Sequence, residues 1–158
     1  LLNISEGKTV ADIGAGSGWF SVIAAKKVGQ NGKIYAVDIN EDSIKYINER
    51  KSKENLANIE AILGTPVDPK LATDSVDAVL ILKTYHEISE PVKLLTNINK
   101  SLKKDALVGI IDRNGNGKDH GINKEIVIEE AKRAGFRLKA TYDFVKDGMD
   151  YFLIFEKN

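Results

Sequence analysis

The sequence contains no cysteine, and this absence excludes disulfide bonds, thiolate metal sites and cysteine nucleophiles together. It also carries no net charge, because 23 basic residues balance 23 acidic ones. Such a balance gives no sign of a nucleic-acid-binding stripe or a polybasic membrane anchor. No apolar run approaches the roughly 18 residues of a membrane span. We therefore expect a soluble, cytoplasmic protein that acts on a small molecule, with a homodimer left open.

The length of 158 residues fits one domain around one core, and the sequence pattern indicates its class. Short apolar runs alternate with segments of helical period, which is typical of βαβ units around a parallel sheet. The apolar runs predict strands at Thr9–Ile13, Lys33–Asp38, Ile59–Leu63, Val76–Leu82, 106–112, 136–144 and 151–156. The helical spacing predicts helices at Trp19–Val28, 40–53, 91–102 and 124–134.

Three local features refine this pattern. In the first helix, Phe20, Ile23 and Ala24 are expected to face the core. Asn40 is placed to cap the second helix. The connection 146–150 is too short for a helical crossover, so the last two strands should pair antiparallel.

The strongest motif lies where the first strand runs into a glycine turn and then a helix. Gly14, Gly16 and Gly18 follow Asp12 at alternate positions. Without side chains they allow a tight turn and close approach of a ligand, and the helix start offers unpaired N–H groups. The segment resembles the first motif of class I S-adenosylmethionine-dependent methyltransferases, an acidic residue followed after one position by Gly-x-Gly-x-Gly.

The resemblance implies a Rossmann-like α/β fold: a seven-stranded mixed sheet, parallel except for one strand near the edge, flanked by helices. It further implies methyl transfer from S-adenosylmethionine to an unidentified small-molecule acceptor, with S-adenosylhomocysteine as product. By this resemblance Asp12 holds the amino end of the methionine moiety, Asp38 binds the ribose hydroxyls and Ile39 lies against the adenine. The full set of implied cofactor-binding residues is Asp12, Gly14, Ala15, Gly16, Gly18, Asp38, Ile39, Gly64, Thr65 and Lys83.

Two other functions stay open. The dinucleotide fingerprint Gly-x-Gly-x-x-Gly also follows a first strand, so a nicotinamide-dependent oxidoreductase is one alternative. Here the third glycine comes one residue early, and Asp12 would repel a pyrophosphate. Asp38 does not discriminate, since both cofactors carry a ribose, and it could simply cap the next helix. The other alternative is a non-catalytic cofactor-binding module, because Gly64 and Thr65 are followed by Pro66, which has no N–H to offer an adenine.

The segment after the fourth strand should face cofactor and substrate, because ligands of open α/β sheets bind beyond the carboxyl ends of the strands. Within it, Lys83 is expected near the methionine end of the cofactor. His86 is the candidate general base, since histidine ordinarily titrates near neutrality. Tyr85 is the second catalytic candidate. Capping or packing remains the alternative for both.

No metal site is expected. A site would require His86, His120, Asp112 and Asp119 to converge, and no pair of them has compact metal-ligand spacing. Asp112 and Arg113 are instead candidates for substrate contact or a solvated loop pair. Relatives usually cover the site with helices before the first strand, whereas here only residues 1–8 are present for that purpose. We therefore expect that the domain lacks an N-terminal lid.

Overall fold

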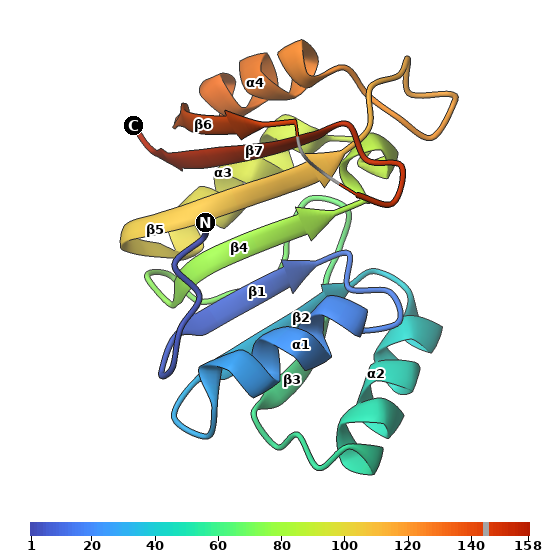
Figure 1. Cartoon of the computed structure of the whole chain (residues 1–158), viewed down its shortest axis with the longest axis vertical. Coiled ribbons are helices and arrows are strands. Elements are labelled where there is room, and N and C mark those ends of the chain that lie inside the picture. The colour runs from blue at the N-terminus through green and yellow to red at the C-terminus, as the bar shows by residue number, and fades with distance from the viewer. Residues whose placement is uncertain (144–145) are drawn as a thin grey trace.

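The computed structural model describes residues 1–143 and 146–158, which form a sheet with helices on both faces (Figure 1). In this part of the chain seven strands are hydrogen-bonded in the order β3-β2-β1-β4-β5-β7-β6. Their bounds are β1 Thr9–Ile13, β2 Lys33–Asp38, β3 Ile59–Leu63, β4 Val76–Leu82, β5 Leu102–Asp112, β6 Phe136–Tyr142 and β7 Tyr151–Lys157. β1 to β5 pair in parallel, and β7 is antiparallel to both of its neighbours. The predicted fold is confirmed.

The helices cover both faces of the sheet. They are α1 Trp19–Val28, α2 Glu41–Lys53, α3 Pro91–Ser101, α4 Lys124–Arg133 and a short 3-10 helix η1, Tyr85–Glu87. α1 and α2 pack on one face, in front of β1 to β3 in Figure 1, and α3 and α4 pack on the other. A separate core lies under each pair. Among the described residues no helix has the length and apolar character needed to cross a membrane.

The cap of α2 agrees with the sequence. Asn40 accepts hydrogen bonds from the backbone N–H groups of Asp42 and Ser43, which satisfies two donors of the first turn. With α2 capped at Asn40, β2 ends at Asp38, and this carboxylate lies at the carboxyl end of the strand.

Three expectations need correction. Of the three residues predicted to face the core from α1, Ala24 is buried and Phe20 is partly buried, but Ile23 is 48% exposed; Val22 and Val28 are buried as well. Because almost the whole helix is apolar, its sequence did not mark one face. β5 begins at Leu102 rather than 106, since Leu102 pairs with Val76 before the register shifts. The described part of β6 ends at Tyr142, and the predicted remainder at Phe144 lies outside the described residues.

The topology places the site. Strand order reverses between β1 and β4, and the loops that follow their carboxyl ends diverge at this switch point. The glycine loop follows β1, the Asp38 segment follows β2, Gly64 and Thr65 follow β3, and η1 follows β4. All of these segments therefore meet along one edge of the sheet.

Candidate functional site

The three glycines of the loop have positive φ angles, a backbone conformation that residues with a side chain rarely adopt. Gly14, Gly16 and Gly18 have φ angles of 74°, 54° and 75°. A Cβ on Gly14 would lie 2.4 Å from the Thr84 side chain, so glycine is required where the loop passes the end of β4. A Cβ on Gly16 would meet no atom closer than a backbone oxygen at 4.0 Å. The loop is thus closed against the protein at Gly14 and open to a ligand at Gly16.

Asp38 has a role that sequence reasoning missed, because it also fixes the glycine loop. Its Oδ2 accepts a hydrogen bond from the Gly16 N–H at 2.8 Å, and its Oδ1 accepts one from the Asn40 N–H at 3.0 Å. The Gly14 and Ala15 N–H groups both donate to the Val37 carbonyl, at 2.9 and 3.0 Å. Each Asp38 oxygen keeps a lone pair for a ligand hydroxyl. The alternative that Asp38 caps α2 is wrong, because Asn40 is the cap.

One cleft of about 370 Å³ opens beside Asp38. Its lining brings together predicted cofactor residues from three loops, namely Gly14, Gly16, Asp38, Ile39 and Thr65, with Pro66, Thr84 and Glu87 nearby. Ile39 is 60% exposed on this wall, as a side chain that lies against a flat ring would be. These residues form a nucleoside-sized recess.

Thr65 remains able to bind a ligand. Its hydroxyl oxygen accepts a hydrogen bond from the Asp68 N–H at 3.0 Å. The hydroxyl still has one proton to donate and one lone pair to offer. Gly64 is held close by, since its N–H donates to the Asp38 carbonyl at 2.9 Å.

A second cleft, of about 840 Å³, lies on the other side of the glycine loop. Gly14 lines both clefts. The walls of the second cleft are mainly apolar, with polar groups at Asp12, Ser17, Lys83, Lys146 and Asp147. Lys83 has a positive φ of 58°, and its N–H donates to the Ile111 carbonyl at 2.8 Å, which holds the backbone at the end of β4.

Asp12 supplies the buried charge of this cleft. Its side chain is 2% exposed and accepts a hydrogen bond from the Ser21 hydroxyl at 2.6 Å. Burial raises the pKa of Asp12 to about 6, and the neighbouring Asp38 charge adds to the rise. A cation in the cleft would counter both effects. The N-terminus of α1 has no side-chain cap, so its N–H groups are suited to an anionic group of the same ligand.

Tyr85 faces away from both clefts. It is buried in the core, and its hydroxyl donates a hydrogen bond to Glu130 of α4 at 2.7 Å. Burial, followed by the hydrogen bond to Glu130, raises the pKa of Tyr85 well above its ordinary value. Neither its position nor its protonation suits catalysis, so the packing alternative describes this residue.

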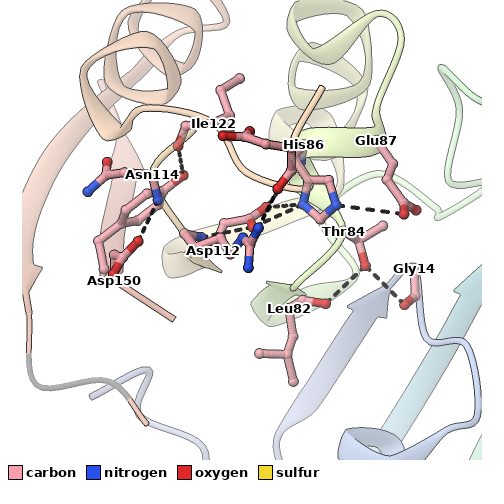
Figure 2. A network of polar contacts seen from close by, with 12 residues as sticks. Gly14, Leu82, Thr84, His86, Glu87, Asp112, Asn114, Ile122 and Asp150 are labelled. Atoms are coloured by element: carbon pink, nitrogen blue, oxygen red, sulfur yellow. Dashed lines mark hydrogen bonds and ion pairs between the residues drawn. The ribbon is translucent and has the colours of Figure 1, made fainter. Parts of the chain in front are cut away.

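His86 is paired with Asp112, the residue at the end of β5. Its Nδ1 lies 3.0 Å from each Asp112 carboxylate oxygen, and its backbone N–H donates to the same carboxylate at 3.1 Å. The Asp112 side chain is fully buried, whereas that of His86 is 9% exposed. Figure 2 shows the imidazole between Asp112 on one side and Glu87 on the other. Because the carboxylate accepts at Nδ1, the basic lone pair lies on Nε2.

The predicted role of Asp112 in substrate contact is therefore replaced by an orienting role. The structure also brings His120 beside His86, with ring centroids 6.1 Å apart in a T-shaped arrangement. Ligand atoms of His86, Glu87 and His120 all lie within 4.8 Å of one another. Sequence spacing could not reveal this, because 34 positions and a change of strand separate the two histidines.

Together these features define a class of protein: an open α/β domain with two clefts at the switch point of its sheet, one beside Asp38 and the other beside Asp12. The methyltransferase domain family matches residues 4–143. The chain belongs to this family of class I S-adenosylmethionine-dependent methyltransferases.

Solved structures and curated proteins agree with this assignment. A SAM-dependent methyltransferase from Aquifex aeolicus is 28% identical and superposes with a TM-score of 0.87, over 98% of this chain and 84% of that one. The (S)-coclaurine N-methyltransferase of Thalictrum flavum subsp. glaucum is 29% identical over 66% of this chain and 28% of its own length. A demethylmenaquinone methyltransferase of Listeria monocytogenes is 24% identical over 71% of this chain and 47% of its own length. The chain thus spans less than half the length of these two curated relatives.

Proposed function

We propose that this protein transfers a methyl group from S-adenosylmethionine to a small-molecule acceptor. The observation that carries the proposal is the pair of clefts that meet at Gly14, with Asp38 in the wall of one and Asp12 in the wall of the other. Asp38 offers acceptors for two ribose hydroxyls in the nucleoside cleft, and Asp12 offers a buried negative charge for an ammonium in the other. A ligand with a nucleoside at one end and an amino acid at the other fits both.

The chain's own residues fit this cofactor at each end. The open face above Gly16 lets the ligand approach the backbone, while Ile39 and Thr65 offer an apolar surface and a hydroxyl to the base. The uncapped start of α1 receives the carboxylate of the amino-acid end, and Asp12 receives its ammonium. When bound, S-adenosylmethionine supplies a methyl group activated by a sulfonium. Holding donor and acceptor in line accounts for much of the acceleration of such a transfer.

His86 lines neither cleft but lies beside Glu87 of the first, and we infer that it takes a proton from an acceptor that carries one. Asp112 fixes the ring through Nδ1 and directs Nε2 away from the buried carboxylate. Asp112 is therefore a positioning residue for His86. Acceptors that already present a free lone pair do not need this step.

A small, partly apolar acceptor suits the second cleft. Trp19, Phe20, Met149 and Phe152 line it beside Lys83. The relatives are named for reactions on coclaurine, demethylmenaquinone and arsenite, which are all small molecules. The nicotinamide alternative fits less well, because Asp12 would face a pyrophosphate in this cleft.

Calorimetric titration with S-adenosylmethionine, S-adenosylhomocysteine and NAD tests the cofactor. We expect both sulfur compounds to bind and NAD not to bind, and NAD binding alone would overturn the proposal. Release of S-adenosylhomocysteine in a screen of small acceptors then tests transfer.

The variant Gly16→Ala tests the placement. An added Cβ meets no close atom there, so the protein should fold, yet the methyl group occupies the surface where the ligand lies. We expect affinity for S-adenosylhomocysteine to fall by roughly tenfold or more, about 1.4 kcal/mol. Gly7→Ala is the matched control, because Gly7 also has a positive φ, of 81°, and open space but lies outside both clefts. Equal binding by the two variants would refute the placement.

A further inference from the structure

We propose that His86, Glu87 and His120 form a binding site for a divalent transition-metal ion, with Zn²⁺ as the best match. Two imidazoles and one carboxylate are a common ligand set for zinc in sites that keep a fourth position open. The three residues come from η1 and from the loop between β5 and α4, at the edge of the sheet where β4 and β5 end. The proposal rests on this cluster alone and does not depend on methyl transfer.

The distances are close to those that an ion requires. Ligand atoms bound tetrahedrally at about 2.0–2.1 Å from zinc lie about 3.4 Å from one another. The Nε2 of His86 is 3.7 Å from Oε1 of Glu87, and all three ligand atoms lie within 4.8 Å. The Glu87 side chain is 67% exposed, and His120 is exposed as well. Both can therefore move to bring the ligand atoms from at most 4.8 Å to the spacing of about 3.4 Å around the ion.

A second observation, independent of these distances, points to a ligand at Nε2. A metal-bound histidine ordinarily donates its other ring N–H to a carboxylate, which fixes the ring and raises the basicity of the ligating nitrogen. Here Nδ1 is held at 3.0 Å by both oxygens of Asp112, a fully buried carboxylate (Figure 2). Asp112 thus fixes the His86 ring at Nδ1, while Nε2 lies 3.7 Å from Oε1 of Glu87.

The loop that carries His120 is tied down at both ends. The Asn114 N–H donates to Asp150 at 2.8 Å (Figure 2). The Ile122 N–H donates to the Arg113 carbonyl at 2.8 Å. Asp119 is outside the group of ligand atoms that lie within 4.8 Å of one another, and its carboxylate accepts the Asn116 N–H at 3.0 Å, which closes the turn. The loop therefore presents His120 to η1 as part of a closed hairpin.

The ion would change the chemistry proposed for this edge of the sheet. With the ion bound, Nε2 of His86 is a ligand, and a water or acceptor oxygen in the open position becomes more acidic. Without it, His86 itself takes the proton. An acceptor with an oxygen or nitrogen donor could thus be held and activated by the same three residues.

Titration with Co²⁺ in place of Zn²⁺ tests the site, because tetrahedral Co²⁺ has visible absorption bands that report its ligands. The experiment uses the whole chain without S-adenosylmethionine. We expect bands to appear with one equivalent of Co²⁺ and to disappear when Zn²⁺ competes. His120→Ala and Glu87→Gln should each weaken binding by roughly tenfold or more, about 1.4 kcal/mol.

Glu90→Gln is the matched control. Glu90 lies three residues beyond Glu87, is exposed and pairs with Lys93 outside the cluster. It should leave Co²⁺ affinity unchanged. No tetrahedral bands in the wild type, or equal affinity in wild type and His120→Ala, would overturn the proposal. Titration of the same preparations with S-adenosylhomocysteine separates this result from the cofactor proposal, since a chain can bind either ligand without the other.

Discussion

The buried carboxyl group of Asp12 makes stability depend on pH in an unusual direction. Burial raises its pKa from 3.8 to about 6 in the folded protein, whereas the unfolded chain keeps the ordinary value. The difference of about 2 pH units corresponds to about 3 kcal/mol. Because the folded state binds the proton more tightly, this contribution to stability is complete below pH 3.8 and is lost as the pH rises through about 6.

The substitution Asp12→Asn isolates this effect, because the amide does not titrate. Between acid and neutral pH, the free energy of unfolding of the wild type should fall by about 3 kcal/mol relative to the variant, and about half of this fall should occur between pH 5 and 7.5. Urea denaturation of both proteins over that range measures it. Placing an amide next to Ser21 also changes stability, but it changes the difference in free energy of unfolding between the two proteins by the same amount at every pH. A difference that stays flat with pH would refute the reasoning.

Asp12→Asn should also weaken ligand binding, although it removes the pH-dependent loss of stability. An ammonium beside Asp12 favours the ionised carboxylate, so affinity of the wild type for S-adenosylhomocysteine should fall below pH 6. At pH 7.5, Asp12→Asn should bind about 10- to 100-fold more weakly, as expected for loss of a charge-assisted hydrogen bond of about 1.5–3 kcal/mol. Calorimetric titration below pH 6 and at pH 7.5 measures the affinity of the wild type and of the variant. Unchanged affinity in the variant would place the amino end of the ligand elsewhere.

Three further substitutions test other parts of the site. Gly14→Ala puts a methyl group 2.4 Å from the Thr84 side chain at a positive φ, so it should destabilise the fold by about 2 kcal/mol or more in chemical denaturation; wild-type stability would contradict the close packing. Tyr85→Phe removes a hydrogen bond to α4 and should lower stability by about 1–2 kcal/mol while leaving methyl transfer unchanged. A loss of turnover would instead show that Tyr85 takes part in catalysis. Asp112→Asn replaces the carboxylate with an amide next to the N–H groups that donate to it, so it should lower stability by about 2 kcal/mol and shift the pH profile of turnover. An unaltered pH profile would show that Asp112 does not act through His86.

Features that depend on neighbours along the chain could be predicted from the sequence. The alternation of apolar runs and helical spacing placed the strands and helices, and Asn40 was recognised as a cap because capping involves only the next three residues. The glycine pattern and Asp38 predicted residues that line the cleft beside Asp38, since a strand, turn and helix in succession bring them to one edge of the sheet. The family resemblance was visible in the same segment.

What only the tertiary structure decided involves residues that separate elements bring together. Asp38 holds the loop at Gly16, Asp112 orients His86, and His120 reaches the same point from a later loop. The inward turn of Tyr85 was equally hidden, because its partner lies on α4, 45 residues away. Local sequence specifies backbone conformation through spacing and propensity, but the direction of a side chain at a strand end depends on which strand is its neighbour, and that is settled by the packing of the whole sheet.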